Sequence, residues 1–218
     1  MTYTTETISD VNSYGLDWKN REIFLHSYIG NNDEEPGVDY RMTATFYKNL
    51  RLLDAMNNDP IIIHMHSVGG SWYDGMAIYD AMLVCQSYIT MIVYGQAQSM
   101  SSVILQAADA RIMMPHAYFM CHFGSTSYSG NYLDVHKAAR FEQKEMETMI
   151  DIYSRRMING RYIKENYTDI TLEKVKNFLK RKLKDGDWYL SAEEAVYYGF
   201  ADNVLTSKRY KNIDSLKT

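Results

Sequence analysis

Apolar and polar residues follow two alternating patterns along this chain. Between residues 42 and 56 the apolar side chains recur every three or four positions, which predicts an amphipathic helix. The run 61–66 is mostly apolar and is typical of a strand buried on both faces. We expect further strands at 22–29, 89–94, 111–114, 117–123 and 202–205, and further helices at 74–86, 101–108, 131–157 and 172–183. Strands that alternate with helices indicate an α/β fold with a largely parallel sheet.

Turn and cap signals divide the chain further. Residues 30–37 are rich in Asn, Asp, Glu, Gly and Pro, and they predict a loop. Ser191 and Glu194 match a capping box that opens a short helix. We expect three parts, which are a flexible N-terminal arm (1–18), one folded domain (19–207) and a C-terminal tail (208–218).

Composition narrows the class of protein. With 218 residues, of which 46% are apolar, the chain is long enough for one domain with a real core. Its net charge of −4 is spread without a basic patch, which argues against a nucleic-acid partner. Cys85 and Cys121 lie in apolar segments and are expected to be reduced. No apolar run is long enough to cross a membrane and the polar N-terminus lacks a signal-peptide core, so we expect a cytoplasmic protein.

Candidate chemistry begins at Ser99, which lies at the turn between a predicted strand and a predicted helix. A serine on such a turn is presented openly for nucleophilic attack. His122 ends a predicted strand and could act as the base, and Asp187 could orient its imidazole. The backbone N–H groups of Gly70 and Met100 are candidate donors to an oxyanion.

Each of these residues also has an ordinary alternative. Ser99 could simply begin a helix, and His122 could be a hydrogen-bonded histidine at a strand end. Asp187, or Asp185 two positions earlier, could be a surface charge at the end of a helix. Gly70 belongs to a Gly-Gly pair that a strand-to-helix turn alone could require.

A metal or cofactor is not expected. His64 and His66 share one face of a strand, which permits a pair of metal ligands. No third ligand with zinc-like spacing accompanies them, so we interpret both as structural. The sequence also holds no Gly-Lys-Ser/Thr motif for phosphate binding, so any use of ATP would come from a partner.

The order of these motifs resembles the family of proteolytic subunits of ATP-dependent Clp proteases. The matching segments are 67–70 (Ser-Val-Gly-Gly), 75–82, 95–100 (Gly-Gln-Ala-Gln-Ser-Met), 111–115 with His122, and 187–195 with Tyr198, Gly199 and Asp202. The resemblance implies that Ser99 is the nucleophile, His122 the base and Asp187 the orienting acid. It also implies that Gly70 and Met100 donate to the oxyanion.

The resemblance implies a fold and an assembly as well. The fold would be the ClpP- and crotonase-like arrangement of repeated ββα units. A protruding handle would consist of a strand at 124–130 and a helix at 131–157, although that helix could instead pack only on its own core. The active form would be two stacked seven-membered rings that cleave unfolded polypeptides delivered by a hexameric AAA+ ATPase.

Several positions depart from the family pattern. Val68 replaces a proline in the Ser-Pro-Gly-Gly motif. Gln98 and Ser101 replace very small residues beside the serine, and Phe123 and Gly124 replace Gln-Pro after the histidine. These changes bear on the shape of the substrate groove more than on the chemistry.

Other functions stay open at this point. The chain could be a non-catalytic subunit of a mixed ring, or an enzyme of the same fold that acts on acyl-CoA. It could also be a processing protease of the viral maturation type that works without an ATPase. This last alternative is kept open by the N-terminal arm (1–18), which has no clear match in the family. The segment 158–184 is longer than usual and has no assigned role.

Overall fold

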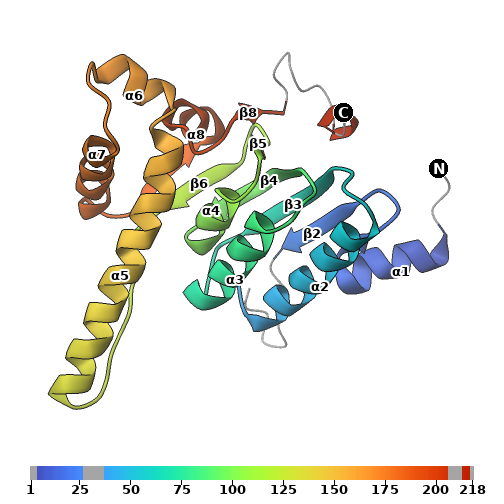
Figure 1. The fold of residues 1–218 in the computed structure, drawn as a ribbon, viewed down its shortest axis with the longest axis horizontal. Helices are drawn as coiled ribbons and strands as arrows, with labels where there is room; N and C mark the ends of the chain where they lie inside the picture. Colours follow the sequence, from blue (N-terminus) through green and yellow to red (C-terminus); the bar gives the residue numbers. More distant parts are fainter. Residues whose placement is uncertain (1–3, 27–36, 206–212, 217–218) are drawn as a thin grey trace.

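The computed structural model describes residues 4–26, 37–205 and 213–216 and places them in a mixed α/β fold (Figure 1). Its strands are β1 (Leu16–Asp17), β2 (Glu22–His26), β3 (Ile61–Ser67), β4 (Ile89–Gln98), β5 (Ala110–Met113), β6 (Tyr118–Cys121), β7 (Trp188–Ser191) and β8 (Asn203–Val204). Its helices are α1 (Thr5–Tyr14), α2 (Tyr40–Met56), α3 (Trp72–Leu83), α4 (Met100–Leu105), α5 (Tyr132–Met157), α6 (Arg161–Asn166), α7 (Leu172–Lys184), α8 (Ala192–Tyr198) and the 3₁₀ helix η1 (Ile213–Leu216). The predicted α/β fold class is confirmed.

A single sheet joins these strands in the order β1-β2-β3-β4-β5-β8, with β6 paired to β4 and β7 paired to β6. The pairings of β2 with β3, β3 with β4, β4 with β5 and β6, and β5 with β8 are parallel. Only β1 and β7 are antiparallel to their neighbours in the described part of the chain. Because β3, β4 and β6 run in the same direction, their carboxyl ends meet at one edge of the sheet.

Helices α2, α3 and α4 cover one face of this sheet (Figure 1). The apolar residues of α2 that the sequence pattern singled out face the core, and the buried ones are Met42, Phe46, Leu50 and Leu53. This spacing puts them on one side of the helix, as an amphipathic helix requires. The Asp39 carboxylate begins α2 by accepting hydrogen bonds from the N–H groups of Arg41 and Met42.

The opposite face of the sheet carries a smaller apolar cluster. Ile62, Ile92 and Ile112 come from three neighbouring strands, and Leu216 of η1 is buried with them. Part of the predicted C-terminal tail is therefore packed onto the sheet. The rest of that tail lies outside the described residues.

The N-terminal segment differs from the flexible arm that we expected over residues 1–18. Its described part forms α1 and β1, and Leu16 of β1 is buried in the core. The Thr4 side chain caps the start of α1, and Gly15 ends it with a φ of 63°. These two cap residues were the local sequence signal for the helix. The segment between them is mostly polar, so it shows no clear apolar pattern that would predict a helix.

Three other segments are only partly described, or take a form that the sequence did not predict. The strand predicted at 22–29 is described as far as His26, and its end, together with nearly all of the predicted loop 30–37, lies outside the described residues. Residues 124–130, predicted as a handle strand, form no strand in the single chain, where they run beside α5 (Figure 1). The long segment 158–184 adds α6 and α7.

Helix α5 projects from the body of the molecule (Figure 1). Its buried residues all lie toward its C-terminal end and are Met149, Ile150, Ile152, Tyr153, Ser154 and Met157. Helix α7 packs beside it, where Lys176 pairs with Asp151 and Lys180 pairs with Glu147, both at 2.7 Å. The base of α5 thus packs on the core, and its outer part extends beyond it. Among the described residues, no helix combines the length and the apolar character that crossing a bilayer requires.

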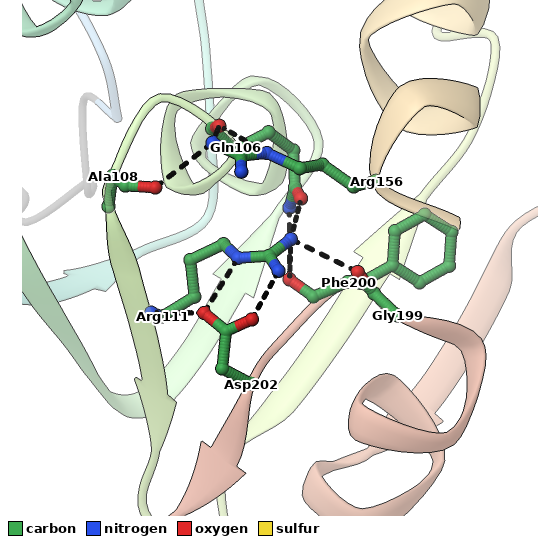
Figure 2. Close-up of polar contacts among 7 residues, drawn as sticks. All are labelled: Gln106, Ala108, Arg111, Arg156, Gly199, Phe200 and Asp202. Carbon is green, nitrogen blue, oxygen red and sulfur yellow. Dashed lines mark hydrogen bonds and ion pairs between the residues drawn. The ribbon is translucent and has the colours of Figure 1, made fainter. Parts of the chain in front are cut away.

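A buried arginine ties several elements together near α4 (Figure 2). Arg111 of β5 donates from Nε to the Asp202 carboxylate at 3.0 Å and from Nη1 to the Gln106 side chain at 2.9 Å. The same nitrogen donates to the Gly199 carbonyl at 3.0 Å. Arg156 of α5 donates from Nε to the Gln106 carbonyl at 2.9 Å. These bonds fix the end of α4 relative to α5, β5 and the segment after α8.

We predict that Arg111→Met lowers the free energy of unfolding by about 2–4 kcal/mol, because several buried acceptors lose their donors. Denaturant unfolding at fixed protein concentration measures this change. The matched control is Arg155→Met, which removes an exposed pair with Asp151 and should cost no more than about 0.5 kcal/mol. Equal losses in the two variants would contradict the role given to Arg111.

Candidate active site

Ser99 lies between β4 and α4 in a strained backbone conformation. Its φ of 51° and ψ of −125° fall in a region that residues other than glycine rarely adopt. The chain turns sharply here, at the carboxyl edge of the sheet, and α4 begins with the next residue. The strand-to-helix turn that the sequence predicted at Ser99 is confirmed.

Strand β6 brings His122 to this turn. The Ser99 N–H donates to the Met120 carbonyl at 2.9 Å, which extends the pairing of β4 with β6 to Ser99. His122 follows two residues after Met120. Its Nε2 lies 2.8 Å from the Ser99 Oγ, which is hydrogen-bond distance.

Strand β7 brings Asp187 to the other side of the imidazole. In the antiparallel pairing of β6 with β7, Cys121 lies opposite Trp188. One position beyond this pair, His122 follows Cys121 and Asp187 precedes Trp188, so the two residues come opposite each other. The His122 Nδ1 lies 3.1 Å from the Asp187 Oδ1. Asp185 instead lies at the C-cap of α7. The structure thus joins Ser99, His122 and Asp187 in one hydrogen-bonded chain.

The turn after β3 places Gly70 beside Ser99. The Val38 N–H donates to the Gly69 carbonyl at 2.6 Å, and the Ser71 N–H donates to the Val38 carbonyl at 2.8 Å. In such a parallel bridge the residue between the two bonds, here Gly70, points its own N–H away from the partner. Gly70 lines the same cleft as Ser99.

Both glycines of this turn are required by close backbone approach. Gly69 has a φ of 94°, and a Cβ there would lie 2.7 Å from the Ser99 Cβ and 2.8 Å from the Met100 nitrogen. Gly70 has a φ of 152°, and a Cβ there would lie 2.4 Å from the Val38 carbonyl oxygen. Side chains at either position would displace the backbone around Ser99.

Buried hydroxyl groups hold the start of α4. The Ser101 Oγ donates to the Ser67 Oγ at 2.7 Å, which joins α4 to the end of β3. The Ser102 Oγ donates to the Ser99 carbonyl at 2.6 Å and also lies 2.6 Å from the Tyr153 hydroxyl. Burial raises the pKa of the Tyr153 phenol well above its ordinary value, so this group stays neutral. Through Ser102, helix α5 therefore contacts the backbone of Ser99.

A cleft of about 380 Å³ opens beside Ser99. One wall carries Gly70, Met100 and His122. Another wall is a face of α5 whose cleft-lining residues are Glu142, Glu145, Met146 and Met149. The sequence pattern predicted the helix but not this use of its face. Their spacing was the available signal, since positions three, four and seven apart lie on one side of a helix.

The other candidate groups lie outside this arrangement. His64 contacts the Glu22 carboxylate through Nε2 and the Tyr94 hydroxyl through Nδ1, both at 3.0 Å. In the described ranges, no three His, Cys, Asp or Glu side chains gather as a metal site. Both cysteines are free thiols, as predicted. Cys121 is adjacent to His122 but fully buried, and burial raises the pKa of its thiol, which makes it a poor nucleophile.

Comparisons with known proteins agree on one family. The family model for Clp protease matches residues 11–208. An ATP-dependent Clp protease proteolytic subunit from Deinococcus radiodurans is 33% identical over 175 residues, which cover 79% of this chain and 78% of the relative. A solved structure of a ClpP1 point mutant from Listeria monocytogenes superposes with a TM-score of 0.70 at 20% identity, covering 91% of this chain and 96% of the other.

The strain at Ser99 gives a prediction about stability. Glycine adopts the observed φ and ψ freely, whereas alanine does not, so Ser99→Gly should be more stable than Ser99→Ala by about 1 kcal/mol after the entropy cost of glycine. Denaturant unfolding of the two variants measures the difference. If Ser99→Ala is as stable as Ser99→Gly, the backbone of Ser99 is not strained.

Proposed function

Because the chain belongs to the Clp protease family, whose members are serine peptidases, we propose that it is a serine endopeptidase that uses Ser99, His122 and Asp187. The observation that carries the proposal is the continuous chain of hydrogen bonds from Asp187 through His122 to Ser99. This is the arrangement that turns a weak serine nucleophile into a strong one.

In the first half of the reaction, the Ser99 Oγ attacks the carbonyl carbon of the peptide bond. The His122 Nε2 takes the hydroxyl proton, and the Asp187 carboxylate holds the Nδ1–H and stabilises the imidazolium. The Gly70 and Met100 N–H groups donate to the oxyanion that forms. His122 then protonates the leaving amine, and an ester between Ser99 and the substrate acyl group results.

In the second half, water attacks this ester. His122 takes a proton from the water and returns one to the Ser99 Oγ as the carboxylic acid leaves. The peptide bond is thus hydrolysed with no net change in the enzyme. The proposed chemistry uses only side chains and backbone N–H groups, and neither a metal nor an organic cofactor takes part.

The proposed setting is a closed chamber. Clp proteolytic subunits generally form rings and work with ATPase partners, and the match of this chain to the family model extends over nearly all of its length. We propose two stacked seven-membered rings that enclose the Ser99 sites and receive unfolded polypeptides from an AAA+ ATPase. The projecting half of α5 is suited to contacts between rings because it extends beyond the core (Figure 1).

The alternatives differ in what they require of this site. A non-catalytic ring subunit or an acyl-CoA enzyme has no need for the aligned Ser99, His122 and Asp187. A processing protease that works without an ATPase would use the same residues and would differ only in its partner. The aligned residues favour a protease over the first two functions.

Reaction with a fluorophosphonate probe tests the proposed nucleophile. We expect the assembled wild-type protein to gain the mass of one probe per subunit, because His122 activates the Ser99 hydroxyl. Ser99→Ala should gain none, and intact-mass spectrometry measures both. Ser125→Ala is the matched control, since Ser125 lines the same cleft and should leave the labelling unchanged. An unlabelled wild-type assembly, or a labelled Ser99→Ala, would refute the proposal.

The role of Asp187 has a separate test. Asp187→Asn should lower kcat for peptide hydrolysis by about 10²- to 10⁴-fold, because the neutral amide cannot stabilise the imidazolium. Steady-state hydrolysis of a fluorogenic peptide measures the loss. Asp185→Asn is the control and should leave kcat nearly unchanged, since that residue lies at the end of α7. Similar losses in the two variants would show that the effect is one of local charge alone.

A further inference from the structure

The wall of the cleft that α5 forms is acidic as well as apolar. Glu142 and Glu145 both line the cleft that contains Ser99, and Met146 and Met149 lie on the same side of the helix. No lysine or arginine is among the residues that line this cleft in the described part of the chain. The cleft therefore places two carboxylates near the reacting serine without a cation.

These carboxylates differ from Glu147 and Asp151, which lie nearer the base of the same helix. Asp151 pairs with Arg155 and Lys176, and Glu147 pairs with Lys180, so the two carboxylates that lie nearer the base of the helix have cationic partners. Within the cleft, Glu142 accepts only a long hydrogen bond, 3.3 Å, from the Tyr128 hydroxyl.

Glu145 differs from Glu142 in the burial of one carboxylate oxygen. Its Oε1 atom is buried and has no hydrogen-bond partner. Burial and a hydrogen bond to the Glu145 carboxylate raise the pKa of the nearby Tyr73 phenol, so this neighbour is neutral and supplies no positive charge. A carboxylate oxygen that is buried without a donor is costly, and a ligand that supplies a charged donor removes that cost.

A lysine or arginine side chain has the form that this cleft requires. Its long methylene stem can lie against Met146, Met149 and Val103, which also lines the cleft. Its cationic head can then reach Glu142 and Glu145 and form charge-assisted hydrogen bonds. A neutral side chain would leave the carboxylates without a cationic partner, and an acidic one would be repelled.

We propose that Glu142 and Glu145 select substrates with lysine or arginine at the residue whose carbonyl Ser99 attacks. This inference rests on the proposed function, since it assigns a specificity to the same site. It makes the enzyme a peptidase for cleavage after basic residues. Glu145, with its buried oxygen, makes the larger contribution.

The first experiment compares peptides that differ only at that residue. Fluorogenic peptides carrying arginine, citrulline, leucine or glutamate are hydrolysed by the assembled wild-type protein. Citrulline matches the shape of arginine without its charge. We expect kcat/KM for the arginine peptide to exceed that for the citrulline peptide by at least about tenfold, which is the effect of one charge-assisted hydrogen bond. The glutamate peptide should be the poorest substrate.

Variants of α5 then connect the preference to the carboxylates. Glu145→Gln should reduce the arginine-to-citrulline ratio at least about fivefold, and the double change with Glu142→Gln should bring it close to one. Glu147→Gln is the matched control, because Glu147 lies on the same helix but pairs with Lys180. It should keep the wild-type ratio.

The outcomes separate this inference from the proposed function. If the leucine peptide is cleaved but the arginine-to-citrulline ratio is near one, or stays unchanged in the double variant, the specificity is wrong and the peptidase stands. If no peptide is cleaved and the fluorophosphonate probe does not label Ser99, the proposed function fails and the inference fails with it. If Ser99 is labelled but no peptide is cleaved, the preference for a basic residue is measured by how well peptide aldehydes compete with the probe for Ser99. An aldehyde ending in arginine should block labelling at a concentration at least about tenfold lower than one ending in leucine, and equal potency would overturn the inference.

Discussion

The register of β6 between β4 and β7 is the constraint on which the site depends. The bond from the Ser99 N–H to the Met120 carbonyl sets where β6 lies against the turn at Ser99. The pairing of Cys121 with Trp188 then sets Asp187 opposite His122. A shift of one residue in either pairing would point the His122 or Asp187 side chain to the other face of the sheet. Three residues that are far apart in sequence therefore meet because of two strand pairings.

This dependence explains what the sequence could and could not predict. Ser99, His122 and Gly70 stand in local motifs that indicate a turn, a strand end and a close backbone approach. Asp187 was preferred to Asp185 only through the family motif at 187–195, because both residues follow a helix and precede an apolar run. The physical reason for the difference is the antiparallel register of β6 and β7, which is a long-range property. Helix α1 was missed for a different reason, since its polar composition concealed its caps.

The acidic wall of the cleft was also beyond sequence reasoning. The spacing of Glu142, Met146 and Met149 is that of a single helix face, but spacing alone does not say whether a face meets solvent, a core or a substrate. The position of 124–130 beside α5 (Figure 1) and the contact of that helix with α4 through Tyr153 and Ser102 decide the matter. The Glu145 Oε1 atom is buried only because these tertiary contacts surround it. The role of a charged helix face thus depends on which other parts of the fold lie next to it.

Helix α5 links the two halves of the site. Near its C-terminal end, Tyr153 and Arg156 hold the start and the end of α4, through Ser102 and the Gln106 carbonyl. One and two turns before the buried base, the same helix presents Glu145 and Glu142 to the cleft. Because a helix moves largely as a rigid rod, a displacement of α5 would change the support of the Ser99 backbone and the position of the carboxylates together. The backbone of Ser99 and the cleft wall that carries Glu142 and Glu145 are therefore positioned by one element, and the buried contacts at its base determine both.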